Sequence, residues 1–186
     1  MGMDLSPLLP SGFLFCNQQF TNDSLIIRLI ASDPVGTCPL CQTPTKRVHS
    51  FYQRTLADLP MSGKRIKLLV RLRKFFCPLA NYPRKVFAQS YHSVCKPYAR
   101  RLLRADQQIQ AIGLQAGAKS GARLYHTVGQ SVIASTVLRV IRSSPMPVVK
   151  TPRRFGVDDF AFKKGRNYDT ILIDLDGHKP IDLLGS

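Results

Sequence analysis

Acidic residues are scarce in this sequence, and glutamate is absent from it. All eleven acids of the 186 residues are aspartates, set against 27 lysines and arginines, so the formal net charge is +16. The imbalance is concentrated in residues 38–105, which hold 15 basic residues and a single acid, Asp58. Such a stretch repels itself unless a polyanion neutralises it. We therefore expect a nucleic-acid partner, ahead of the other roles that basic proteins fill.

Long apolar runs are missing as well. No run approaches the roughly 18 residues that a membrane span requires, and the N-terminus, Met1-Gly2-Met3-Asp4, lacks the basic start of a signal peptide. The five cysteines are an odd number, which fits a reducing compartment better than a disulfide framework. We expect a cytoplasmic protein without a membrane partner.

Three cysteines have the spacing of a structural zinc site. Cys38 and Cys41 form a C-x-x-C knuckle, and Cys77 follows a basic stretch as the start of a second knuckle. Structural zinc takes four ligands, but the place where we look for the fourth, five residues after Cys77, carries Tyr82. Tyrosine is a poor zinc ligand, so His49 or a water would have to substitute. Either zinc is bound in this way, or the site has degraded and the fold survives on packing.

The segment between the knuckles alternates in hydrophobicity. Within residues 64–76 the apolar side chains recur at every second position and basic side chains fill most of the others, which predicts a half-buried strand with a basic outer face. We expect a turn over residues 54–63 before it, a second strand over residues 25–31 and irregular structure over residues 1–23. The side chains that we expect to bind DNA are Lys64, Arg65, Lys67, Arg71, Arg73, Lys74, Arg84, Lys85, Arg139 and Arg142.

The period becomes helical after the second knuckle. Residues 99–116 and 122–126 read as helices separated by glycines, and a last helix follows a turn over residues 127–130, with Ser131 as its cap. Helix, glycine-bearing turn and capped helix outline a helix-turn-helix, in which Ser135, Leu138, Arg139 and Arg142 would point outward. An ordinary helical hairpin fits the same pattern equally well.

A proline-bearing linker over residues 144–153 leads to a different kind of sequence. Three strands are predicted over residues 155–162, 170–175 and 180–184, which together form a β-meander. Asp158 and Asp159 lie on the first strand, where alternation points them to opposite faces. A carboxylate there can hold Mg²⁺ for phosphoryl transfer, but this chemistry requires two or more carboxylates at a metal pair. Asp174 and Asp176 are candidate neighbours, although aspartate is also common at strand ends and turns.

These motifs, taken in order, resemble the N-terminal part of bacterial insertion-sequence transposases of the ISL-three family. That family has a zinc finger, a helix-turn-helix and a catalytic domain of ribonuclease-H-like fold with a DDE acidic triad. The residues that carry the resemblance are Cys38-Pro39-Leu40-Cys41, residues 47–50, 52–60 and 83–87, the basic strand to Cys77, residues 135–139, Gly156-Val157-Asp158-Asp159-Phe160-Ala161, Lys164-Gly165 and residues 170–175.

The resemblance implies a role for each module. Asp158 takes the position of the first catalytic acid, and Mg²⁺ is the cofactor of a complete enzyme. The finger and the helix-turn-helix would bind double-stranded DNA at the terminal inverted repeats of the element. Tyr82 stands where the family has its fourth cysteine, and Gln89 where it often has glutamate. The second Asp and the final Glu of the family lie beyond Ser186, so we expect a truncated transposase that binds DNA and is catalytically inactive alone.

The expected fold class is α+β with several modules. Residues 1–37 form an N-terminal segment with one strand, 38–90 a zinc-ribbon-like β module, 91–143 a helix-turn-helix module, 144–153 a linker and 154–186 the start of a ribonuclease-H-like β-meander. A homo-oligomer, or an assembly with a full-length transposase, would provide further partners. The alternative function is that of a stand-alone zinc-ribbon and helix-turn-helix DNA-binding regulator.

Overall fold

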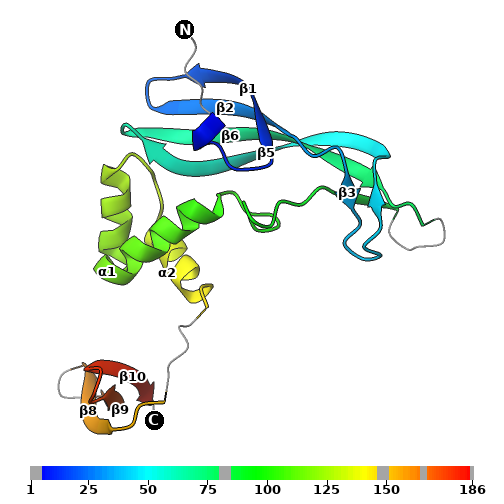
Figure 1. Cartoon of the computed structure of the whole chain (residues 1–186). Coiled ribbons are helices and arrows are strands. Elements are labelled where there is room, and N and C mark those ends of the chain that lie inside the picture. Colours follow the sequence, from blue (N-terminus) through cyan, green and yellow to red (C-terminus); the bar gives the residue numbers. More distant parts are fainter. Residues whose placement is uncertain (1–5, 80–84, 146–150, 164–166, 185–186) are drawn as a thin grey trace. The chain divides into compact units, whose positions relative to one another are not determined.

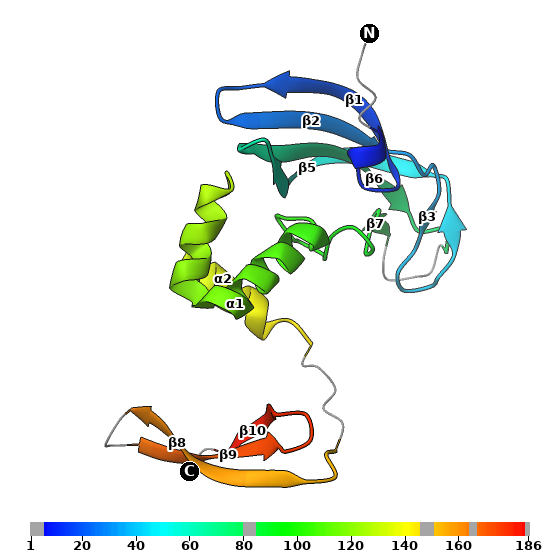
Figure 2. The same ribbon diagram turned by 60° about the vertical axis from the view of Figure 1, so that its left-hand side comes forward.

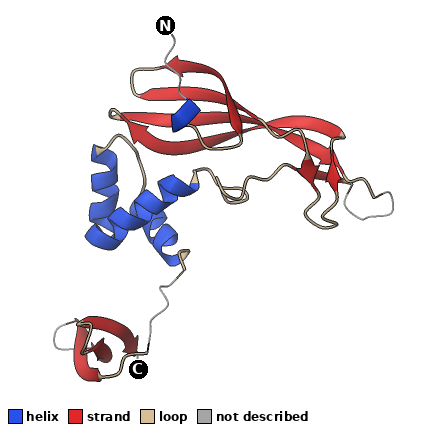
Figure 3. Ribbon diagram, viewed as in Figure 1, coloured by secondary structure: helices blue, strands red, loops and turns tan. Residues whose placement is uncertain are grey.

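The computed structural model describes residues 6–79, 85–145, 151–163 and 167–184. The chain divides into two compact units, Met1–Ser144 and Pro145–Ser186, and the three segments expected before the linker share the first of them. Strands dominate and helices are fewer, so the predicted α+β class is confirmed (Figure 3). Across the described ranges, no helix combines the length and the apolar character that a membrane crossing demands.

The sheet of the first unit is built around one long central strand. In the described part of this unit five strands pair in the order β1-β2-β6-β5, with β7 also on β6 (Figure 1). Strands β2 and β6 are parallel and the other pairs are antiparallel. The elements are η1 (Ser6–Leu8), β1 (Phe13–Phe20), β2 (Ser24–Ala31), β3 (Gly36–Thr37), β4 (Pro44–Thr45), β5 (Val48–Met61), β6 (Lys64–Phe76) and β7 (Val86–Ala88).

The alternation predicted for residues 64–76 is confirmed in β6. Its even-numbered apolar residues from Ile66 to Leu72 are at most 5 % exposed and join the odd-numbered apolar residues of β2 in the main core, while Lys67 and Arg71 on the other face are exposed. Burial of each such side chain stabilises the fold by about 1.5–3 kcal/mol. The buried residues of the two strands are Leu25, Ile27, Leu29, Ala31, Ile66, Leu68, Val70 and Leu72.

Two predictions of irregular structure were wrong. Residues 13–20 form the edge strand β1, whose side chains are almost all exposed, Cys16 included, so backbone pairing with β2 holds it and no hydrophobic pattern marks it. Strand β5 extends to Met61, and the turn before β6 is reduced to Ser62 and Gly63, which have φ values of 51° and 73°. Strand β5 is the other edge of the sheet, and Pro60 lies in the register shift between Asp58 and Met61, where proline is tolerated because the ladder is interrupted.

Helix α1 of the first unit contacts β5, and α2 packs against α1 (Figure 1, Figure 2). Helix α1 (Leu103–Thr127) is broken at Gly117, where φ is 73°, and α2 (Ala134–Arg142) follows a short turn. Three helical segments therefore form where three were expected. The first begins at Leu103 because residues 100–102 bond to the backbone of Ala57 in β5 instead.

A small core joins the helical segments. It contains Ile109, Tyr125, Val137 and Val140, and a Cβ on Gly113 would lie 2.5 Å from Val137 Cγ1. The absence of a side chain at Gly113 therefore lets α2 approach α1 closely. The cap expected at Ser131 was wrong: Ile133 occupies the N-cap of α2, and its side chain makes no capping hydrogen bond.

One buried carboxylate fastens the helices to the sheet. Asp58, at the end of β5, is 4 % exposed and accepts hydrogen bonds from Arg104 of α1, one of them from Nε at 2.6 Å. The Leu59 N–H donates to the same carboxylate at 2.8 Å, and Gln130 Nε2 donates to the Asp58 carbonyl oxygen at 2.6 Å. The hydrogen bond with Asp58 raises the pKa of Arg104.

The second unit is the predicted β-meander. Strands β8 (Phe155–Lys163), β9 (Asn167–Asp174) and β10 (Lys179–Leu184) pair antiparallel in the order β10-β9-β8 within the described ranges of this unit. The three predicted strands are confirmed to within a few residues. The predicted turn over residues 164–167 lies largely outside the described residues.

We predict that Asp58→Asn lowers the free energy of unfolding by about 1–3 kcal/mol, measured by urea denaturation. Loss of the charge leaves the Arg104 guanidinium without its ionic partner. The cost stays below the 3–5 kcal/mol of a fully buried pair, because the Arg104 side chain is 41 % exposed. Asp23→Asn is the matched control, since the Asp23–Arg65 pair is solvent-exposed on both sides and should contribute little. Equal effects of the two substitutions would contradict the anchoring role of Asp58.

Candidate metal centre and nucleic-acid surface

A short hairpin and the end of β6 bring three thiols together. Strands β3 and β4 form a small hairpin whose tip carries Cys38 and Cys41, closed by hydrogen bonds from the Cys38 N–H to the Thr43 carbonyl at 3.1 Å and from the Gln42 N–H to the Cys38 carbonyl at 2.9 Å. Cys77 directly follows β6 and its N–H donates to the Lys85 carbonyl at 2.9 Å. The three sulfur atoms lie within 4.8 Å of one another.

Aromatic packing supports this cluster. Cys38 is fully buried and Cys77 is 9 % exposed, and both contact a core of Phe75 and Phe87, whose rings stack with centroids 5.8 Å apart. Gly36 lies against the ring of Phe75, where an added Cβ would come within 2.4 Å of a ring carbon. The thiol positions therefore depend on residues from β3, β6 and β7 together.

The local contacts move the thiol pKa values in opposite directions. Hydrogen bonding with Thr43 lowers the pKa of Cys41 to about 7, whereas burial raises the pKa of Cys77. Zinc binds the thiolate form, so the contact with Thr43 favours the form of Cys41 that a metal requires.

The geometry of the cluster fits zinc. Four ligands at a Zn–S distance of about 2.3 Å in a tetrahedron place neighbouring sulfurs about 3.8 Å apart, and Cys41 Sγ lies 3.7 Å from Cys77 Sγ. His49 is not a member of the cluster: it is exposed, its Nδ1 lies 2.8 Å from Ser50 Oγ, and its ring packs edge-on against Phe76. Tyr82, the residue at the expected fourth position, lies outside the described residues.

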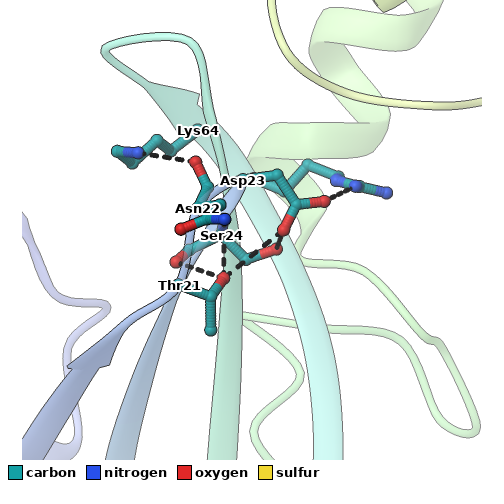
Figure 4. Close-up of polar contacts among 6 residues, drawn as sticks. Thr21, Asn22, Asp23, Ser24 and Lys64 are labelled. Carbon is teal, nitrogen blue, oxygen red and sulfur yellow. Dashed lines mark hydrogen bonds and ion pairs between the residues drawn. The ribbon is translucent and has the colours of Figure 1, made fainter.

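Several side chains expected to bind DNA make contacts within the chain. Lys64 Nζ donates to the Asn22 carbonyl at 2.8 Å and Arg65 pairs with Asp23, so both hold the turn between β1 and β2 (Figure 4). Arg73 Nη1 donates to the carbonyls of Ala31 and Asp33 at 2.7 and 3.1 Å. These three cations stabilise the sheet, and their role in DNA binding stays a prediction.

Other predicted side chains face solvent. Lys67 and Arg71 are exposed on β6, with the Arg71 guanidinium 4.3 Å from the centre of the Phe51 ring, and Lys85 is exposed before β7. Lys74 Nζ lies 5.6 Å from the centre of the Tyr52 ring. Arg84 falls outside the described residues.

Helix α2 presents the outward face that the sequence predicted. Val137 and Val140 are buried, whereas Ser135, Leu138, Arg139 and Arg142 are exposed.

Sequence reasoning missed two basic residues between the sheet and the helices. Lys96 and Arg100 are exposed, and they line one cleft together with Lys74. The signal was a proline-bearing basic and aromatic cluster, Lys96-Pro97-Tyr98, directly before the helical pattern. No periodicity marks such a loop, and only the fold shows that it lies opposite β5.

The acidic residues of the second unit do not assemble a metal pair. Asp158 is exposed, accepts a hydrogen bond from the Asp159 N–H at 2.8 Å and lies opposite Ile171, while Asp174 lies opposite Phe155. An offset of three residues along β8 puts Asp158 and Asp174 on opposite faces. Over the described ranges, the cysteine cluster is the one group of three or more metal-ligating side chains. The residues present therefore do not fit a Mg²⁺ pair.

Comparisons with known proteins match the zinc finger and also a longer part of the chain. Residues 34–78 match the family model described as the zinc-finger of transposase IS204/IS1001/IS1096/IS1165. The chain is also 25 % identical over 154 residues to the transposase for insertion sequence element IS1001 of Bordetella parapertussis, a match that covers 81 % of this chain and 36 % of that protein. The chain thus spans about a third of the length of this relative. No solved structure matches it.

The family model covers the hairpin of β3 and β4, the whole of β5 and β6, and all three clustered cysteines. The resemblance expected from the motifs is confirmed: residues 34–78 match the zinc ribbon of the ISL-three family of insertion-sequence transposases, and the chain is similar over 154 residues to one insertion-sequence transposase.

Proposed function

We propose that this chain binds double-stranded DNA as the recognition part of an insertion-sequence transposase, and that its target is the terminal inverted repeat of the element. The observation that carries the proposal is the transposase zinc finger at residues 34–78, set in a stretch of 15 basic residues and one acid. That single acid, Asp58, is buried in an ion pair with Arg104, so it neutralises none of the other cations of the stretch.

The zinc ribbon has a structural part in this function. Zinc on the three thiolates would join the hairpin of β3 and β4 to the end of β6, and so fix one end of the basic sheet. No thiol of the cluster is needed for DNA contact. The metal is expected to act by ordering the protein, without contact to the DNA.

Helix α2 is the proposed reading element. A recognition helix buries one face against its own domain and offers the other to the major groove. Val137 and Val140 supply the buried face, and Arg139 and Arg142 on the exposed face can contact phosphates or guanine edges. The three helical segments would then act as a helix-turn-helix.

Asp158 corresponds to the first acid of the catalytic triad in the family, but alone it supports no phosphoryl-transfer step. Two-metal chemistry needs several carboxylates around one metal pair, and the described residues of the second unit contain no group of three or more metal-ligating side chains. The sequence also contains no glutamate. The proposed function of these residues is therefore binding, without strand transfer.

We predict about one zinc per purified chain by elemental analysis, lost in Cys77→Ser. The substitution removes one of three thiolates, and the remaining two cannot hold a structural zinc ion. Cys16→Ser is the matched control, because Cys16 is exposed on β1 and outside the cluster, and it should retain the metal. A chain without zinc before any substitution would show a degraded site.

We predict salt-sensitive binding to a duplex that carries the inverted repeat, measured by fluorescence anisotropy. Each neutralised phosphate contributes about 0.9 to the slope of log affinity against log salt. Arg139→Ala combined with Arg142→Ala should reduce that slope by about 2, because two phosphate contacts are lost.

Arg28→Ala combined with Lys119→Ala removes the same charge from exposed positions outside the finger and α2, and should leave the slope close to that of the unmodified chain. A scrambled duplex of equal composition separates repeat recognition from general affinity. Affinity that does not change with salt would refute the basic surface as the contact.

A further inference from the structure

Two basic clefts that share one loop lie between the zinc knuckle and α2, and together they are called the cleft here. One part, of about 690 Å³, is lined by Pro39 of the knuckle, by Tyr52 and Arg54 of β5, and by Lys74. A second part, of about 570 Å³, reaches Arg139 of α2. Both parts share residues 96–100, the loop that leads into α1. The cleft lies on the sheet face that packs the core, since Tyr52 pairs with buried Leu72.

The charge of the cleft is almost wholly positive. Its lining includes one acid among the described residues, Asp106, and that carboxylate accepts a hydrogen bond from Arg101 Nε at 2.7 Å. Lys96, Arg100 and Arg139 are exposed and make no side-chain hydrogen bond or ion pair with the described part of the chain. Three cations therefore remain for a polyanionic ligand, spaced along a single path.

Tyr98 stands in the middle of this path with its side chain in solvent. It is 98 % exposed, the highest value among the exposed large apolar and aromatic residues described. Its φ is 57°, and Ala99 N–H donates to the Lys96 carbonyl at 3.1 Å across it. Proline second and a left-handed residue third is the pattern of a type II turn, in which glycine is the usual third residue. Neither packing nor backbone preference explains a tyrosine here.

The loop that carries Tyr98 is held in place by Arg54 of β5. Arg54 Nη2 donates to the Ala99 carbonyl at 2.5 Å, and Arg54 Nη1 lies 3.7 Å from the sulfur of buried Cys95. The backbone of the loop is therefore held in place, whereas the ring of Tyr98 stays exposed to solvent. Phe51 on the opposite face differs, because the Arg71 guanidinium already covers it at 4.3 Å.

Resting on the proposed DNA binding, we infer that the cleft binds a single-stranded segment of DNA, with Tyr98 stacked on an unpaired base and with Lys96, Arg100 and Arg139 along the phosphates. Proteins that hold single strands combine a positive groove for the backbone with exposed aromatic rings for the bases. A base in a duplex is covered on both faces by its neighbours and offers only its edges to a groove. A free aromatic ring between cations therefore favours a strand whose bases are unpaired.

The test measures affinity of the full chain for a 20-nucleotide single strand and for the matched duplex by fluorescence anisotropy. Tyr98→Ala should weaken single-strand binding roughly 5- to 100-fold, the loss that removal of a base-stacking ring causes, and should leave duplex binding unchanged. Tyr98→Phe keeps the ring and should bind like the unmodified chain. Tyr168→Ala, a second exposed tyrosine on β9, is the control and should have no effect.

Tyr98→Gly separates binding from folding. Glycine suits the left-handed turn position, so this variant should melt no lower than the unmodified chain and still lose single-strand affinity. Lys96→Ala combined with Arg100→Ala should reduce the salt slope for the single strand by about 1.4, from two contacts at about 0.7 each. Arg28→Ala combined with Lys119→Ala should not reduce it.

The possible outcomes separate the single-strand site at Tyr98 from the proposed DNA binding of the whole chain. Unchanged single-strand affinity in Tyr98→Ala overturns the stacking role while duplex binding still stands. Equal losses for duplex and single strand overturn selectivity for unpaired bases. Failure of the unmodified chain to bind either DNA removes the proposed function together with the cleft.

Discussion

The buried carboxylate of Asp58 determines how the first unit holds together. Within residues 38–105 it is the one acid among 15 basic residues, and it is 4 % exposed. A buried carboxylate is costly unless it is paired and hydrogen-bonded. Arg104 of α1 and the Leu59 N–H donate hydrogen bonds to this carboxylate. The negative charge of Asp58 on the sheet is therefore balanced by a residue of a helix. Sheet and helices consequently form one unit despite the mutual repulsion of their surface cations.

Hydrogen bonds and ion pairs within the chain divide the cations into two groups. Lys64, Arg65 and Arg73 are directed to backbone carbonyls or to Asp23 and hold β2 beside β6. Lys96 and Arg100 have no such partner in the described chain. A basic strand is thus not uniformly a binding surface. The residues best placed for phosphates are those that the fold does not use, and they include residues of loops and of α2 as well as exposed Lys67 on β6.

The predictable parts of this protein are those with a periodic or spaced signal. Alternation from Ile66 to Leu72 gave β6 correctly, and the spacing of Cys38, Cys41 and Cys77 identified the thiol cluster. Strand β1 was not predicted because an edge strand with exposed side chains has no hydrophobic period. The cleft could not be predicted from the sequence because its residues come from the knuckle, β5, a loop and α2. Only tertiary contacts bring these residues together.

The zinc knuckle and the cleft are physically linked. Pro39 lies between Cys38 and Cys41 and lines the wall of the cleft opposite the loop of Tyr98. A metal on the three thiols restricts the hairpin that carries Pro39, because each thiolate is fixed by its bond to the ion. The free energy of zinc binding therefore contributes to the shape of the cleft as well as to folding. Ordering of this wall before DNA arrives lowers the entropy lost on binding, so a structural metal can increase affinity without touching the nucleic acid.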